Sequence, residues 1–179
     1  MMKRSETKWL SVGMAVFAIV AFPMVAVGET VRTNLTGFEE TPVLSTPGSG
    51  EFKARIREKS QEIDYELSFR DTESVVTQAH IHFGPLSIAG PIVIFLCSNL
   101  GNGPAGTQAC PAAGGTITGT ITPANVGAGA AAQGIAAGEF DEVLAAIRAG
   151  VTYVNVHTVN RPGGEIRGQL DRHHHHDDD

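Results

Sequence analysis

The sequence lacks the motifs of several large enzyme classes. It contains no nucleophile elbow, no phosphate-binding glycine loop and no convincing pair of carboxylates, so a hydrolase has no support. No segment after residue 28 is apolar enough to span a membrane. Helical patterns are scarce until residue 139, and no internal repeat or second domain is evident. We therefore expect one domain of ordinary size, built mostly of strands.

Basic residues are also few. The 13 basic and 19 acidic residues of the chain become 10 and 18 once Lys3, Arg4, Lys8 and Glu6 are left out, which is a net charge of −8. A surface of this sign repels nucleic acid and anionic lipid, so neither is expected as a partner. It is compatible with a metal cation.

Residues 1–28 have the pattern of a secretory signal peptide. Basic residues near the start precede an apolar run over residues 9–27, and Ala26 and Gly28 are small residues placed for a cut before Glu29. The alternative is an uncleaved membrane anchor, because the run approaches spanning length. In both cases the rest of the chain is exported. We expect a secreted, periplasmic or cell-surface protein, with no membrane contact after signal cleavage.

The two cysteines, Cys97 and Cys110, predict a single disulfide. An even cysteine count in an exported chain indicates pairing, and the segment between them is polar and rich in glycine. A bridge over so short a loop typically stabilises a fold by roughly 3 kcal/mol. The alternative is that a cysteine ligates a metal.

Apolar periodicity predicts an all-β fold with one short crossover helix. Alternation or continuous apolar character indicates strands over residues 50–58, 62–70, 75–83, 90–97, 114–122, 151–158 and 164–170. Residues 90–97 are apolar on both faces, which is typical of a central strand. Residues 139–150 carry apolar side chains at helical spacing and end at Gly150. This pattern predicts a β-sandwich or Greek-key barrel, with the glycine-rich residues 124–138 as a loop.

Alternation along residues 75–83 places His80 and His82 together on one face of a strand. The opposite, apolar face carries Val75, Thr77, Ala79, Ile81 and Phe83. The Cα atoms of the two histidines are then roughly 6.5–7 Å apart, so both rings can approach one ion. The same pattern predicts a polar face for them and argues against histidines satisfied within a core.

His157 is the third histidine before the C-terminal tail. If strands 151–158 and 164–170 form a hairpin that pairs His157 with Glu165, then Glu165, Arg167 and Gln169 lie on the histidine's side. Glu165 is then expected to orient an imidazole by hydrogen bonding or to bind the ion directly.

A His-x-His pair with a third histidine is a familiar ligand set for copper or zinc. Nothing in the sequence shows that the two strands adjoin, so three exposed histidines that never meet are the alternative. The tail, residues 171–179, is a separate case. Four consecutive histidines followed by three aspartates bind copper, nickel or zinc loosely and without defined geometry, or form a solvated acidic tail. The tail histidines are His173, His174, His175 and His176.

Three blocks of the sequence resemble the CHRD domain, which is named for its repeats in chordin. They are LTGFEETPVLSTPGSGEFKARI (35–56), AHIHFGPLSIAGPIVIFL (79–96) and YVNVHTVNRPGGEIRGQL (153–170). The resemblance covers nearly all of residues 29–170. It implies an immunoglobulin-like β-barrel, an exported protein and no established enzymatic activity. In chordin the module belongs to an extracellular protein that binds signalling ligands. The family's histidine positions correspond here to His80, His82 and His157, whereas the tail is outside its pattern.

A weaker resemblance links HIHFG (80–84) to the copper-ligating strand of copper–zinc superoxide dismutases. Those enzymes are also exported barrels with one disulfide, but they need about six histidines and an aspartate around two metals. Only three histidines precede the tail here. The resemblance therefore allows a single copper site and does not support a bimetallic centre.

Three hypotheses follow for the function. The first is non-catalytic binding, storage or delivery of copper, with zinc as the alternative ion, by His80, His82 and His157. The second is an extracellular protein-interaction or structural module in which the histidines are incidental. The third is a copper-dependent oxidoreductase of superoxide-dismutase type, which needs an open coordination position.

Overall fold

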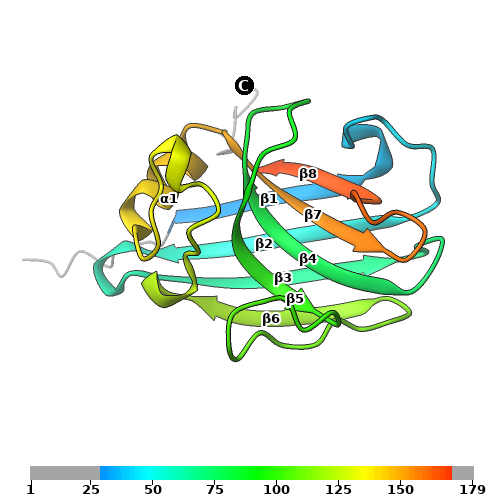
Figure 1. Ribbon diagram of the computed structural model, residues 1–179, viewed down its shortest axis with the longest axis horizontal. Coiled ribbons are helices and arrows are strands. Elements are labelled where there is room, and N and C mark those ends of the chain that lie inside the picture. The colour runs from blue at the N-terminus through cyan, green and yellow to red at the C-terminus, as the bar shows by residue number, and fades with distance from the viewer. Residues whose placement is uncertain (1–28, 171–179) are drawn as a thin grey trace, which may run out of the picture.

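The computed structural model describes residues 29–170, which form eight strands and one α-helix (Figure 1). The strands are β1 (Glu29–Thr36), β2 (Ser49–Arg57), β3 (Glu62–Arg70), β4 (Val76–Phe83), β5 (Ile92–Ser98), β6 (Gly115–Ile121), β7 (Thr152–Thr158) and β8 (Ile166–Leu170). The helix α1 spans Phe140–Arg148, and 3-10 helices span Gly37–Glu39, Glu58–Ser60, Pro123–Asn125 and Ala131–Gln133.

All strand pairs are antiparallel, in the order β5-β4-β7-β8-β1-β2-β3-β6. The sheet curls into a nearly closed barrel, and the connection from β6 to β7 carries α1 at one end of it (Figure 1). This architecture confirms the predicted all-β fold with one crossover helix. No helix among residues 29–170 is long and apolar enough to cross a membrane.

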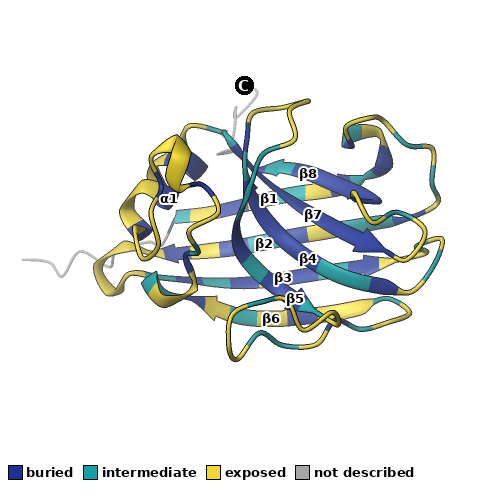
Figure 2. Ribbon diagram, in the orientation of Figure 1, coloured by how far each residue is buried: buried dark blue, intermediate teal, exposed yellow. Residues whose placement is uncertain are grey.

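The barrel interior is filled by alternate residues of the strands. On β2, Phe52, Ala54 and Ile56 are buried, whereas Glu51, Arg55 and Arg57 between and beside them are exposed. This half-buried pattern is what period-two alternation predicts. Strand β7 differs, because all seven of its residues are buried (Figure 2). Both faces of β7 are therefore covered. One face packs in the barrel interior, and the other carries His157.

Strand β5 stands at one end of the strand order, so the prediction that residues 90–97 form a central strand is wrong. Other contacts cover its exposed edge. The Val93 carbonyl accepts the Gly127 N–H at 2.9 Å, and the Leu96 carbonyl accepts the Tyr65 hydroxyl at 3.0 Å. The apolar second face of β5 is used as well, because Phe95 packs edge-on against the ring of His80.

The disulfide loop joins the two ends of the sheet, β5 and β6. The predicted Cys97–Cys110 disulfide is present. Within its loop, the Gln108 amide donates to the carbonyl oxygens of Leu96 on β5 and Thr118 on β6, each at 3.2 Å, and to the Tyr65 hydroxyl at 2.8 Å. Gln108 therefore bridges strands that do not pair directly in the sheet.

Candidate metal centre

The fold brings His80 and His82 of β4 next to His157 of β7. The two strands are adjacent, and His157 lies opposite Gln78, one strand repeat from the partner of His80. One ring nitrogen from each histidine lies within 4.8 Å of the others. The three candidate ligands singled out in the sequence are therefore gathered in one place by β4–β7 pairing.

The histidines are buried, contrary to the expectation of an open polar face. His80 and His82 do lie on the face of β4 that points away from the core residues Ala79 and Ile81. However, His80, His82 and His157 are only 0%, 8% and 6% exposed. Alternation identified the face correctly but could not show that other residues cover it. Phe95 packs edge-on to His80 with ring centroids 4.5 Å apart, and Tyr153 stacks on His82 at 4.8 Å.

Backbone carbonyls orient two of the three rings. The Nδ1 of His82 lies 2.9 Å from the Gly90 oxygen, and the Nδ1 of His157 lies 2.9 Å from the Pro162 oxygen. A carbonyl oxygen only accepts, so each Nδ1 carries the proton and each Nε2 keeps a lone pair. Hydrogen bonds of this kind fix the tautomer and orientation of metal-binding histidines.

The third ring contacts the cluster through its own Nδ1. This atom of His80 lies 3.2 Å from His157 Nε2 and donates to that lone pair in the metal-free protein. Within residues 29–170, the Nε2 atoms of His80 and His82 are buried and have no hydrogen-bond partner. An unpartnered polar atom in a buried position is costly, so both nitrogens need a partner that the metal-free cluster does not supply.

Burial keeps the imidazoles neutral. It lowers the pKa of His80 to about 2, aided by the neighbouring His157 and His82. Burial lowers the pKa of His82 to about 4 even though the Gly90 carbonyl favours its charged form, and burial also lowers the pKa of His157. Neutral imidazole is the form that binds metals, so the cluster needs no deprotonation at neutral pH.

Glu165 does not take the role expected for it. Its carboxylate accepts hydrogen bonds from the hydroxyls of Thr46 and Thr158 at 2.8 and 2.7 Å, and from the backbone N–H of Glu73 at 2.8 Å. Among the described residues it makes no hydrogen bond to a histidine, and the group of possible metal ligands contains no carboxylate. Instead of orienting an imidazole, Glu165 links three parts of the chain through hydrogen bonds from Thr46, Glu73 and Thr158.

A buried polar group beside the histidines was missed from the sequence. It comprises Glu40, Asn155 and Arg167, which are 8%, 2% and 1% exposed. Asn155 Nδ2 donates to Glu40 Oε1 at 2.5 Å, and the Arg167 guanidinium lies over the Tyr153 ring, 3.4 Å from its centroid. Alternation placed Asn155 and Arg167 on the histidine face. No local signal pointed to Glu40, which follows the 3-10 helix Gly37–Glu39 and precedes Asn155 by 115 residues.

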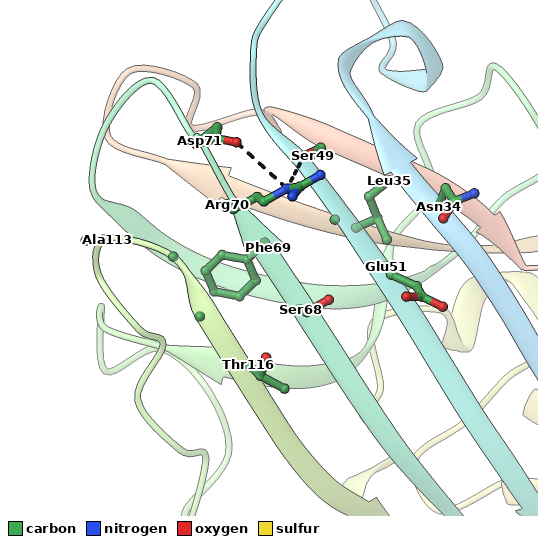
Figure 3. A pocket seen from close by; sticks show the side chains of 13 residues that line it. Asn34, Leu35, Ser49, Glu51, Ser68, Phe69, Arg70, Asp71, Ala113 and Thr116 are labelled. Atoms are coloured by element: carbon green, nitrogen blue, oxygen red, sulfur yellow. Dashed lines mark hydrogen bonds and ion pairs between the residues drawn. The ribbon is translucent and has the colours of Figure 1, made fainter.

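A surface groove lies elsewhere on the barrel. Residues 34–35, 49–51, 68–71 and 113–116 line a hollow of about 690 Å³ on β1, β2, β3 and the start of β6 (Figure 3). Arg70 there donates to the Ser49 hydroxyl at 3.2 Å and lies 3.8 Å from the Asp71 carboxylate. None of the described residues that line it is a buried polar side chain without a partner. The histidine cluster is therefore the stronger candidate site.

The predicted signal peptide, residues 1–28, and the tail histidines His173, His174, His175 and His176 lie outside the described residues. No curated protein and no solved structure matches the chain. The family model for the CHRD domain matches residues 31–170. This range contains all three clustered histidines and all eight strands, apart from the first two residues of β1. The chain therefore belongs to the CHRD domain family.

Proposed function

We propose that the protein binds one transition-metal ion, copper, through His80, His82 and His157, and that it holds the ion without catalysing a reaction. The observation that carries the proposal is the gathering of three buried, neutral imidazoles, two of which have a buried ring nitrogen without a partner in residues 29–170. Imidazole suits copper and zinc, and copper(II) binds nitrogen sites more tightly than zinc does. Copper is therefore the favoured ion and zinc its competitor.

Burial favours binding over catalysis. A copper oxidoreductase needs a coordination position that its substrate can reach. Here the ligand side chains are at most 8% exposed and are covered by Phe95 and Tyr153. The proposed role is storage or delivery of the ion outside the cytoplasm, in keeping with the secretory pattern of residues 1–28.

The test is metal analysis of protein in which the four tail histidines are replaced by serine, so that only the buried cluster contributes. We expect one copper per chain after gel filtration, and loss of that copper in His82→Ala and His157→Ala. Gln78→Ala is the matched control, since Gln78 lies on the same strand and the same face but has no ring nitrogen. Absence of stoichiometric copper, or unchanged binding by His82→Ala, would remove the proposal.

A second candidate is an extracellular protein-interaction module. Two neighbouring loops carry exposed apolar side chains. Arg167 connects the loops, because its guanidinium donates to the Ile88 carbonyl at 3.1 Å and to the Thr41 hydroxyl at 3.5 Å. Phe38, Val43, Leu86 and Ile88 on these loops are each more than half exposed. Exposed apolar groups of this kind mark interaction surfaces. If this is the function, charging or removing Leu86 and Ile88 abolishes partner capture while copper content stays unchanged.

A further inference from the structure

One row across three strands holds several unsatisfied polar atoms. His80 on β4 pairs with Asn155 on β7, and Asn155 pairs with Arg167 on β8. Within the described residues, His80 Nε2, Asn155 Oδ1 and Arg167 Nε are all buried and without a hydrogen-bond partner. A buried polar atom without a partner destabilises the state in which it stands. Their concentration beside the histidines indicates that this row is completed in another state of the site.

The position of His80 identifies which of its nitrogens faces the ion. Two nitrogens bound at about 2.0–2.1 Å to a tetrahedral ion are about 3.3 Å apart. His80 Nδ1 and His157 Nε2 are 3.2 Å apart, so their present separation already suits two ligands of one ion. His157 must bind through Nε2, because its Nδ1 is held by the Pro162 carbonyl.

Ligation through Nδ1 requires a change of tautomer at His80. In the metal-free protein this Nδ1 donates its proton to His157 Nε2. When a metal takes the lone pairs of both atoms, the His80 proton moves from Nδ1 to Nε2, and no proton leaves the ring. The new Nε2–H is buried and needs an acceptor.

Asn155, which pairs directly with His80 across β4 and β7, carries such an acceptor. Its amide orientation is settled by Glu40, because Nδ2 must be the atom that donates to the Glu40 carboxylate. Oδ1 is then the oxygen that remains unpartnered in residues 29–170. An amide held this way has its oxygen available for a donor on the same face of the sheet.

We propose that Asn155 is the positioning residue of the metal centre. Anchored by Glu40, it accepts the Nε2–H of His80 through Oδ1 and thereby selects Nδ1 as the metal-binding atom of that histidine. This inference rests on the proposed function. It assigns His80 the opposite tautomer from His82 and His157 in the loaded protein.

The direct test is nitrogen-15 NMR of the imidazoles in the full chain with its tail histidines replaced by serine. Zinc(II) and copper(I) serve as probes because both are diamagnetic. We expect all three histidines to be Nδ1–H tautomers without metal. On loading, His80 alone is expected to become the Nε2–H tautomer. If neither ion binds, the proposed function and this inference both fail, whereas binding with His80 still protonated at Nδ1 overturns the inference alone.

Two variants separate positioning from packing. Asn155→Leu removes the acceptor and is expected to weaken metal binding about 10- to 100-fold, the usual effect of losing such a partner. Thr152→Val is the matched control. It removes a buried hydroxyl of β7 that also has no partner in residues 29–170. Thr152 lies on the face of the strand opposite Asn155 and His157, so binding should not change. Wild-type affinity in a folded Asn155→Leu protein would overturn the role of Asn155. If that variant does not fold, the nitrogen-15 NMR measurement of the His80 tautomer in the metal-loaded chain still tests the inference.

Discussion

Gly164 lies beside the side-chain amide of Asn155, with no room for a side chain of its own. A Cβ at Gly164 would collide with Asn155 Nδ2 and approach Glu40 Oε1 to 2.7 Å, and the residue has φ +129°. The same turn supplies the Pro162 carbonyl that holds His157. One glycine-containing turn therefore packs against the polar group and orients a histidine.

Gly164→Ala is accordingly expected to lower the free energy of unfolding by about 2 kcal/mol or more, because it adds both backbone strain and overpacking. Gly163→Ala is the matched control, since an added Cβ there meets no described atom within 4 Å. Urea unfolding of both variants makes the comparison. Equal stability of the two would contradict this account of the turn.

Gln108→Ala should weaken the junction of β5 and β6. The substitution removes the donor shared by Tyr65, Leu96 and Thr118. A loss of about 1–2 kcal/mol is expected in denaturant unfolding. Gln133→Ala, at an exposed glutamine, provides the control. A loss no larger than that of the control would show that the bridge does not stabilise the barrel.

Removal of the disulfide should cost more than the loss of Gln108. Cys97 and Cys110 are both buried and enclose a short loop, for which roughly 3 kcal/mol is typical. The double variant Cys97→Ser, Cys110→Ser tests this by equilibrium unfolding beside the oxidised wild-type protein. A difference below about 1 kcal/mol would mean that the loop is ordered without the bridge.

Acid should destabilise the metal-free protein from about pH 6.5 downward. The unfolded chain protonates its histidines near pH 6.5, whereas the folded state resists until about pH 4 for His82 and about pH 2 for His80, with the pKa of His157 also lowered. His80 and His82 each remove up to about 1.4 kcal/mol of stability per pH unit in that window. Unfolding free energies measured from pH 7.5 to pH 5 check this, and His82→Gln should flatten the slope. A profile that His82→Gln leaves unchanged would contradict it.

Glu40 should make the folded protein less stable as pH rises, which is opposite to the effect of the histidines. Burial raises its pKa from 4.5 to about 7, despite the charge of Arg167 and the hydrogen bond from Asn155. The folded state therefore holds a proton that the unfolded chain loses, so stability falls as pH rises from 4.5 through 7. The difference in unfolding free energy between wild type and Glu40→Gln should shrink by about 3 kcal/mol over that window. Subtraction cancels the shared histidine contribution, and a difference independent of pH would show that Glu40 is ionised throughout.

Local periodicity predicted the helix and seven of the eight strands, but it missed β1. The alternation of Phe52, Ala54 and Ile56 predicted a half-buried strand, and β2 has that pattern. Apolar spacing from Phe140 to Ile147 predicted the face of α1 that is buried. Such patterns are local, because the period of a strand or helix is set by its own backbone geometry.

The surroundings of each element could not be predicted in the same way. The apolar β5 stands at the end of the strand order, with its edge covered by Gly127, Tyr65 and Gln108. The carboxylate of Glu165 is taken by Thr46, Thr158 and Glu73 instead of a histidine. These outcomes depend on partners distant in sequence, which alternation does not encode.

The sequence by itself determined that the chain forms a mostly β domain, that Cys97 and Cys110 can pair, and that His80 and His82 share a face. Tertiary structure alone decided that His157, 77 residues from His80, joins them, and that all three are buried, neutral and accompanied by Glu40 and Asn155. The reason is physical. Side-chain direction along a strand follows from its backbone, whereas strand neighbours and burial follow from the packing of the whole sheet.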